Sequence, residues 1–295
     1  MKKIIIFFCI CFSSIAYAQQ EPIFTQYYIN DMYFNPAVSG SKSYNTLIIQ
    51  TRKQWLGFEG APLTTNISYH GALNNRSAMG GYLMFDKAYP SMQANLNVNY
   101  AYHIPLNYDK VHFSFGLGGK VMYHNLDFNE GEVPPGQDNA YSLSAYSKIL
   151  ADASFGTYLY SDDFYFGYST TNLLESSFND PVNENFPNLE RRNHYGIAGY
   201  RFDIINNDWK LEPSLLIRKT GTHASVIDFS TRVFYIQNTW TGVTYRNDGN
   251  LVLSFGFGSG NFHLSYSYDY TMRGDIAKYN LGTHEFGISF HFERY

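Results

Sequence analysis

The sequence predicts an all-β protein: a transmembrane antiparallel β-barrel of about 14 strands, preceded by an N-terminal periplasmic or plug segment. Aromatic residues make up 18% of the 295 residues, whereas charged residues make up only 16%. Apolar and polar residues alternate in segment after segment, which is typical of a sheet with two different faces. After the first 20 residues, no apolar run reaches the roughly 18–20 residues that a membrane-spanning helix needs.

The chain begins with the features of a secretory signal. Lys2 and Lys3 precede an apolar run from Ile4 to Ile15, and Ala16-Tyr17-Ala18 has the small-x-small pattern of a cleavage site. We therefore expect residues 1–18 to be removed and the remaining chain to be exported. Both cysteines of the sequence lie in this apolar run, so the exported part has no thiol for a disulfide or a metal site.

Strand-like segments recur through the rest of the chain, separated by short polar turns or longer loops. The expected strands are 44–55, 61–71, 77–87, 92–104, 110–123, 149–160, 163–171, 193–205, 209–219, 226–236, 239–247, 250–259, 261–271 and 284–294. They define a barrel domain over residues 44–295. Such a barrel encloses a free bore of about 10–15 Å, wide enough for an extended segment or a plug.

The two faces of these segments differ in a way that indicates lipid outside and a polar lumen. In 92–104, for example, Leu96 and Tyr100 belong to an apolar face, and Asn97 and His103 belong to a polar one. A soluble sandwich would bury its apolar face in a core. Long aromatic residues near the strand ends, opposed by Gly, Ser, Asn and His, are instead typical of a membrane barrel.

The lengths of the connections support the same prediction. The three longest, near 124–148, 172–192 and 272–283, all fall at one end of the predicted barrel, whereas the connections at the other end are short. Short periplasmic turns and long external loops are the rule for bacterial outer-membrane barrels. We therefore expect an outer-membrane location.

Two stretches of the sequence resemble the opening of the PorP/SprF family, outer-membrane proteins of the type IX secretion system of Bacteroidota. The matching residues are Phe24-Thr25-Gln26-Tyr27, Asn35-Pro36-Ala37 with Gly40, Arg52, Gln54-Trp55, Gly57-Phe58, Gly60-Ala61-Pro62 and Thr64-Thr65. The resemblance implies a non-enzymatic role in protein secretion and, in some members, gliding motility. The implied partners are a secreted surface protein, held through its C-terminal domain, and a periplasmic lipoprotein or peptidoglycan-binding anchor. The sequence leaves open whether the chain is PorP-like or SprF-like.

The segment 19–43, between the signal and the barrel, is rich in tyrosine and other large apolar residues. Phe24, Tyr27, Tyr28 and Asp31 fall at helical spacing, and Pro36 disfavours a helix at the residue before it. We predict one short amphipathic turn or helix, tucked inside or beneath the barrel. Two roles stay open: closing the periplasmic mouth or docking a partner, and a purely structural seal.

The candidate partner-binding residues come from the two family-like stretches. They are Phe24, Gln26, Tyr27, Tyr28, Asn35 and Pro36 in the segment 19–43, and Arg52, Gln54, Trp55, Phe58 and Pro62 around the first outer turn. Arg and aromatic residues are frequent anchors of protein interfaces. Trp55 fits equally well in the aromatic girdle at the membrane surface, so both interpretations stay open.

The alternative function is a passive outer-membrane channel or small-solute transporter, which the strand number and the polar lumen favour. An outer-membrane hydrolase is a third class, but the sequence has no nucleophile elbow or other local catalytic signature. The net charge of −4 gives no footprint for nucleic acid. We predict no enzyme activity, no cofactor, no metal site and no nucleic-acid partner; outer-membrane lipid surrounds the barrel.

Overall fold

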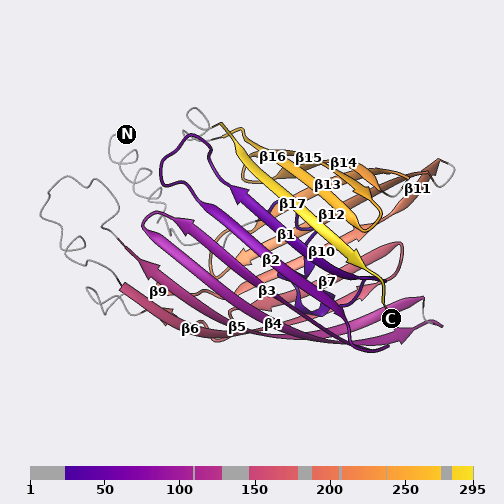
Figure 1. Cartoon of the computed structure of the whole chain (residues 1–295), viewed down its shortest axis with the longest axis horizontal. Coiled ribbons are helices and arrows are strands. Elements are labelled where there is room, and N and C mark those ends of the chain that lie inside the picture. The colour runs from indigo at the N-terminus through magenta and orange to yellow at the C-terminus, as the bar shows by residue number, and fades with distance from the viewer. Residues whose placement is uncertain are drawn as a thin grey trace, which may run out of the picture.

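The computed structural model describes residues 24–108, 110–127, 146–178, 188–205, 208–236, 238–273 and 281–294 (Figure 1). The predicted signal peptide and residues 19–23 lie outside the described residues. The first elements are two single-turn 3₁₀ helices, η1 (Asp31–Tyr33) and η2 (Pro36–Val38). Among the described residues, no helix is long and apolar enough to cross a membrane.

Strands make up nearly all of the remaining regular structure. They are β1 (Asn45–Lys53), β2 (Leu63–Ala72), β3 (Ser77–Ala88), β4 (Ser91–Leu106), β5 (Val111–Leu126), β6 (Tyr146–Tyr160), β7 (Phe164–Thr171), β8 (Ser177–Phe178), β9 (Asn188–Leu189), β10 (Asn193–Tyr200), β11 (Phe202–Ile205), β12 (Trp209–Thr220), β13 (Val226–Tyr235), β14 (Thr239–Arg246), β15 (Asn250–Ser259), β16 (Phe262–Thr271) and β17 (Thr283–Phe292).

The strands close into one antiparallel barrel. Each strand pairs with its neighbour in sequence, apart from the small separate β8–β9 pair, and β1 pairs with β17 to join the first strand to the last. β10 and β11 both pair with β12 and form two parts of one interrupted strand. Counted in this way, the barrel has 14 strands around its circumference. The predicted fold class is therefore confirmed.

The predicted strands agree with the observed ones to within about three residues at each end. One predicted strand, 193–205, is interrupted at Arg201. The Arg201 guanidinium turns to Glu212, with Nε and Nη2 lying 2.9 and 2.6 Å from the carboxylate, while its backbone N–H donates to the Asp163 carbonyl. The β8–β9 pair, inside the connection 172–192, was not predicted.

The two faces of the barrel wall are as the alternation predicted. On β4, Leu96 is 50% exposed and Tyr100 is 45% exposed, whereas Asn97 and Asn99, from the opposite face, are 4% and 2% exposed. Apolar side chains therefore cover the outside, and polar side chains line the lumen. This is the arrangement that a surrounding bilayer requires of a closed barrel.

The two ends of the barrel differ. We call the end that carries the connections 54–62, 127–145, 172–192 and 272–282 the long-loop end, and the opposite end, with β1's start and β17's end, the short-turn end. The C-terminus lies at the right of Figure 1, at the short-turn end. By the loop-length rule, the long-loop end faces the cell exterior.

Candidate functional site

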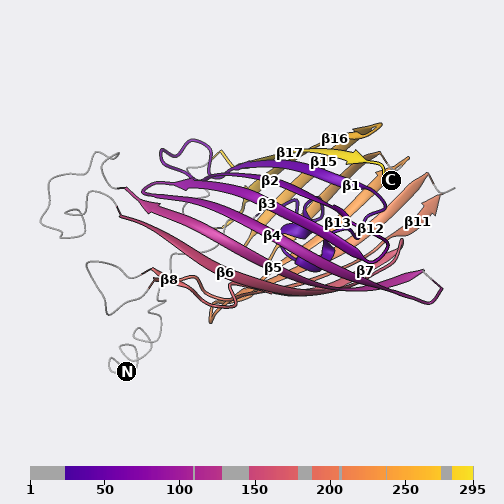
Figure 2. The same ribbon diagram turned by 60° about the horizontal axis from the view of Figure 1, so that its bottom comes forward.

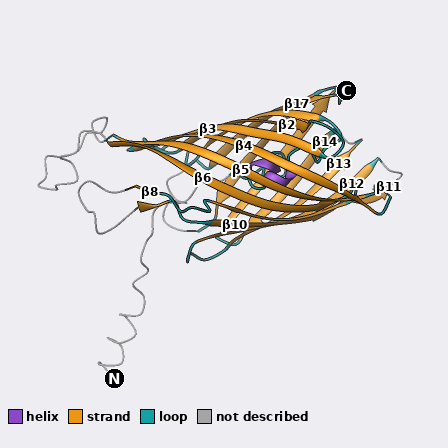
Figure 3. Cartoon of the chain, turned by 90° about the horizontal axis from the view of Figure 1, so that it is seen from below, coloured by secondary structure: helices purple, strands orange, loops and turns teal. Residues whose placement is uncertain are grey.

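Residues 24–42 fill the lumen, and we call them the plug. η1 and η2 lie within the ring of strands in Figures 2 and 3. The plug packs its apolar side chains into one buried cluster with inward-facing residues of the wall. The buried members of this cluster are Phe24, Tyr27, Tyr28, Met32, Tyr33, Phe34, Ala37 and Val38 from the plug, and Met84, Tyr158, Tyr195, Ile197 and Leu216 from the strands.

The plug runs along the lumen from the long-loop end to the short-turn end. Thr25 contacts Glu285 and Asp269, which lie where β17 begins and β16 ends, at the long-loop end. Ser39 contacts His103 near the end of β4, at the short-turn end, through its carbonyl and His103 Nε2 at 2.8 Å. The plug is thus inside the barrel over its described length, rather than beneath it or confined to the periplasmic mouth.

No continuous helix forms over Phe24 to Asp31, but a turn closes there through the Ile29 N–H, which donates to the Gln26 carbonyl at 3.0 Å, and η1 begins at Asp31. η1 and η2 are separated by Asn35, whose backbone is extended (φ −140°, ψ 111°) because Pro36 follows it. Pro36 opens η2 and the Asn35 side chain caps it by accepting the Ala37 N–H at 2.9 Å. The helical spacing therefore reflected lumen packing on several sides, not one helix face.

A buried ionic cluster holds the start of the plug. The Glu285 carboxylate accepts the backbone N–H groups of Thr25 and Gln26 at 2.8 and 3.0 Å. Arg52 donates to the Thr25 hydroxyl at 2.6 Å, to Glu285 at 3.1 Å and to Asp269 at 2.7 Å. The side chains of Arg52, Asp269 and Glu285 are at most 4% exposed. We call these five residues the outer latch.

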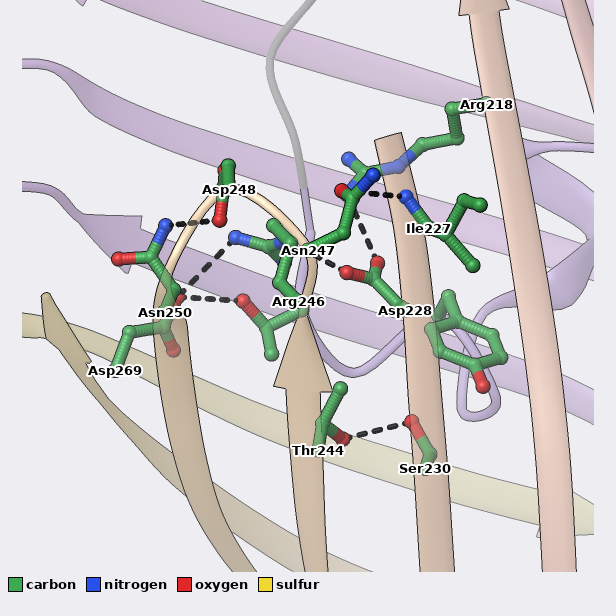
Figure 4. Close-up of polar contacts among 12 residues, drawn as sticks. Arg218, Ile227, Asp228, Ser230, Thr244, Arg246, Asn247, Asp248, Asn250 and Asp269 are labelled. Atoms are coloured by element: carbon green, nitrogen blue, oxygen red, sulfur yellow. Dashed lines mark hydrogen bonds and ion pairs between the residues drawn. The ribbon is translucent and has the colours of Figure 1, made fainter. Parts of the chain in front are cut away.

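Further ion pairs continue around the lumen wall beside the latch. Asp228 lies between Arg218, at 2.8 Å, and Arg246, at 2.6 Å (Figure 4). Arg246 also approaches Asp269 of the outer latch, at 3.9 Å. Removing one partner from such a buried group leaves an uncompensated charge, which typically costs about 3–5 kcal/mol. The charges therefore fix the positions of the strands and of the plug start together.

The middle of the plug combines hydrogen bonds with aromatic packing. The Tyr27 hydroxyl lies 2.9 Å from the Ser214 hydroxyl. Tyr28 donates to Ser254 at 2.9 Å, packs edge-on against Trp240 and lies under the Arg232 guanidinium at 3.9 Å. Such a cation–π contact adds stabilisation where the arginine is desolvated.

Two glycines let the plug touch the wall directly. A Cβ at Gly116 of β5 would lie 2.2 Å from the Ala37 nitrogen, and one at Gly156 of β6 would lie 2.0 Å from Asn35 Oδ1. Both distances are far inside van der Waals contact. Any larger residue at these positions would push against the plug backbone or its cap.

The structure divides the predicted partner-binding residues into two groups. Those of the plug, Phe24, Gln26, Tyr27, Tyr28, Asn35 and Pro36, are all buried in the lumen. Arg52 is also buried, at 3% exposed, and serves the outer latch instead of presenting a charge at the rim. Arg52 lies near the long-loop end of β1, and its side chain faces into the lumen.

The other predicted residues, Gln54, Trp55, Phe58 and Pro62, lie on the turn between β1 and β2, at the long-loop end. The Gln54 N–H donates to the Pro62 carbonyl at 2.9 Å and closes this turn. The Trp55 N–H donates to the Thr283 hydroxyl at 3.1 Å. Phe58 is 39% exposed. We call residues 54–62 the rim turn.

The rim turn is joined to the start of β17 by backbone hydrogen bonds. Leu56 donates to the Gly282 carbonyl and accepts from the Leu281 N–H, both at 2.9 Å. Arg52 and Glu285 of the outer latch lie a few residues away along the same two strands. The rim turn and the start of the plug are therefore linked through the β1–β17 seam.

The acidic partners of the latch were not predicted as site residues. Asp269 and Glu285 fall on the polar faces of their strands, where alternation alone does not separate them from serines and glycines. The signal that could have identified them is a charged residue on the inner face of a strand, repeated in several strands of a membrane barrel. Within the described part of the chain, no three His, Cys, Asp or Glu side chains are placed to hold a metal ion.

Solved structures similar to this one are outer-membrane barrels. The CymD monoaromatic hydrocarbon channel matches with a TM-score of 0.52 at 12% identity, over 90% of this chain and 93% of that one. The outer membrane protein Omp33 of Acinetobacter baumannii matches at 0.47 and 7% identity, over 87% and 100%. The KdgM porin matches at 0.42 and 10%, over 84% and 99%. At these identities, the CymD likeness supports the barrel fold alone.

None of the curated proteins matches this chain significantly. A family model, described as type IX secretion system membrane protein PorP/SprF, matches residues 16–290, which includes the plug, the rim turn and all strands up to most of β17. Fold and family together point to the outer membrane. The chain belongs to the PorP/SprF family of type IX secretion system membrane proteins.

Proposed function

We propose that this protein is a non-enzymatic, sealed barrel of the type IX machinery that docks a secreted surface protein through its C-terminal domain. The observation that carries this proposal is the plug. A lumen filled by the chain itself leaves the two rims as the surfaces on which the barrel meets other proteins. The protein then acts as a holder in the outer membrane and not as a conduit.

The plug argues against the alternative of a passive channel. Its apolar cluster and the outer latch occupy the lumen from end to end. One cavity between the plug and strands β3 to β7, next to Asn97, Asn99 and Lys120, has a volume of about 20 Å³. That volume holds about one water molecule. Solute passage would require the plug to leave, which the buried ion pairs oppose.

The rim turn is the proposed seat of the secreted protein. Phe58 and Leu56 are each 39% exposed, and Trp55 is partly exposed beside them. Exposed aromatic residues on a turn that is fixed by backbone hydrogen bonds at both ends are typical of interface anchors. The alternative for Trp55, a place in the aromatic girdle, predicts no effect of its removal on partner binding.

A Trp55→Ala, Phe58→Ala double variant distinguishes these roles. Docking predicts that the secreted protein is lost from the cell surface, because both anchors are removed while the buried latch is untouched. Heat-dependent electrophoretic mobility controls for barrel assembly. Normal surface retention at normal barrel levels would reject docking at the rim turn.

The short-turn end is the proposed attachment site for periplasmic components, namely a lipoprotein or a peptidoglycan-binding anchor. Purification of the protein from its native membrane, through a tag in an outer loop, tests both sides. A large surface protein that co-purifies supports cargo docking, and a periplasmic lipoprotein supports anchoring. Isolation of the barrel alone, together with steady ion conductance, would favour the channel.

A further inference from the structure

The wall of the barrel has a step between β6 and β7 at the long-loop end. β6 pairs with β5 along its whole length, Tyr146 to Tyr160, but with β7 only from Phe155 to Tyr160. Residues 146–154 therefore have a neighbouring strand on one side only. In Figure 1, β5 and β6 extend on the left beyond β7 and β10.

The sequence explains why β7 stops early. Asn172, directly after β7, has a positive φ of 55°, which breaks the extended backbone. The chain then crosses the step irregularly: the Leu173 N–H donates to the Ala153 carbonyl at 3.1 Å, and the Ser176 hydroxyl donates to the Ala151 carbonyl at 2.6 Å. No strand ladder follows beyond these two contacts along this side of β6.

These contacts also identify which backbone groups face the step. In a β-strand, the N–H and C=O groups of every second residue point to the same side. Because the backbone carbonyls of Ala153 and Ala151 point toward the step, the backbone N–H and C=O groups of Ile149 and Ser147 point toward it too. Across the described residues, no hydrogen bond reaches the N–H of Ala151 or the N–H and C=O groups of Ile149 and Ser147 on this side.

The free edge is only partly protected, by residues 173–177, which contact Ala153, Ala151 and Lys148. Edge strands are commonly blunted by proline, by lysine or by a covering segment. The strand from 147 to 151 contains no proline, and the amine of Lys148 is bonded to the Ser177 carbonyl at 2.8 Å. Ile149 is 69% exposed, and Leu174, across the step, is 66% exposed. The edge thus offers backbone hydrogen-bonding groups flanked by apolar side chains.

We propose that this edge of β6 receives an extended strand of the secreted surface protein, which adds to the barrel wall by β-augmentation. The proposal rests on the docking function proposed above and names its second contact. An extended backbone matches alternating N–H and C=O groups at two-residue spacing, which a helix or a globular side-chain surface does not.

The incoming segment has a definite chemistry. Its side chains alternate between the outward-facing side, beside Ile149, and the lumen-facing side, beside Leu150 and Asp152. Ile149 is highly exposed, whereas Leu150 and Asp152 are each 7% exposed. We therefore expect a strand of about five residues with apolar residues at every second position and at least one polar residue between them.

An Ile149→Pro variant tests the backbone contact. Proline removes an N–H that faces the step and not β5, so the β5–β6 ladder keeps its hydrogen bonds. Ile149→Thr is the matched control, because it changes the side chain but keeps the N–H. The probe is the isolated C-terminal domain of the surface protein that co-purifies with the wild-type barrel. We expect about a tenfold or greater loss of affinity for the proline variant and less than about a threefold change for the threonine variant.

The outcomes separate the two proposals. If the wild-type barrel and the proline variant bind the domain equally, strand addition is overturned while docking stands. If the wild-type barrel binds no such domain, docking itself fails. If the proline variant does not assemble, an Ile149→Cys variant is cross-linked to cysteines placed one at a time along the domain. Cross-linking at every second position supports strand addition, and absent or non-periodic cross-linking overturns it.

Discussion

Arg52 lies directly opposite Glu285 where the first and last strands of the barrel pair, and the Arg52 Nη1 is 3.1 Å from the Glu285 carboxylate. The same carboxylate accepts two backbone N–H groups from the start of the plug. One buried ion pair therefore joins the closing seam of the barrel to the segment that fills it. The rim turn begins two residues after Arg52. Closure, sealing and the proposed docking surface thus share one structural element.

Removal of the arginine should destabilise the barrel. In an Arg52→Met variant, Asp269 and Glu285 lose their nearest shared cation, although Arg246 remains 3.9 Å from Asp269. We expect a loss of about 3–5 kcal/mol in the free energy of unfolding, because a buried charge without its partner is costly. Unfolding followed by the heat-dependent shift in electrophoretic mobility measures it.

A surface ion pair provides the control for that variant. Lys210 and Asp203 are 3.2 Å apart, and the Asp203 side chain is 53% exposed. Lys210→Gln should change the free energy of unfolding by about 1 kcal/mol or less. Equal effects of the two variants would show that the outer latch contributes no more than an ordinary surface pair.

Gly116 should be intolerant of larger side chains because the plug lies against it. A Gly116→Val variant should displace the Ala37 backbone, lower the unfolding temperature and raise the ion conductance of the purified barrel. Gly119, on the same strand, is the matched control, since a Cβ there meets no atom within 4 Å. Gly119→Val should leave both quantities near wild type, and similar behaviour of the two variants would contradict the position of the plug.

The Asn35 side chain should matter for two separable reasons. It accepts the Ala37 N–H at the start of η2 and donates to the Thr157 carbonyl at 2.9 Å. Asn35→Ala loses both bonds and should cost about 1–3 kcal/mol. Asn35→Asp keeps the acceptor but places a carboxylate against a carbonyl, so it separates the cap from the wall contact. Thermal unfolding of both variants measures this, and an alanine variant as stable as wild type would reject the capping role.

Much of the barrel follows from the sequence because its physical signals are local. Alternation along each strand reveals the inward and outward faces, and the sidedness of the long connections reveals the two ends. Arg201 shows a limit of this reasoning. Its pattern continues a strand, but the ladder is interrupted there, and its guanidinium bonds to Glu212 of the neighbouring strand β12. Such a contact depends on the register between paired strands, which local alternation does not encode.

The candidate site was less predictable for the same reason. Phe24, Tyr27 and Tyr28 stand at helical spacing, yet they contact several different strands around a lumen that only the closed barrel creates. Likewise, Arg52 was recognised as a family residue, but its partners Asp269 and Glu285 are more than 200 positions away. Long-range charge pairing of this kind becomes visible only when the strands are in register.

Ion conductance of the purified wild-type barrel in a planar lipid bilayer tests most directly whether the lumen is sealed. The filled lumen predicts no steady openings, with conductance indistinguishable from that of the bare bilayer. Steady openings of the size expected for a free bore of about 10–15 Å would mean that the plug leaves the lumen. The channel function would then replace the proposed role as a sealed docking barrel.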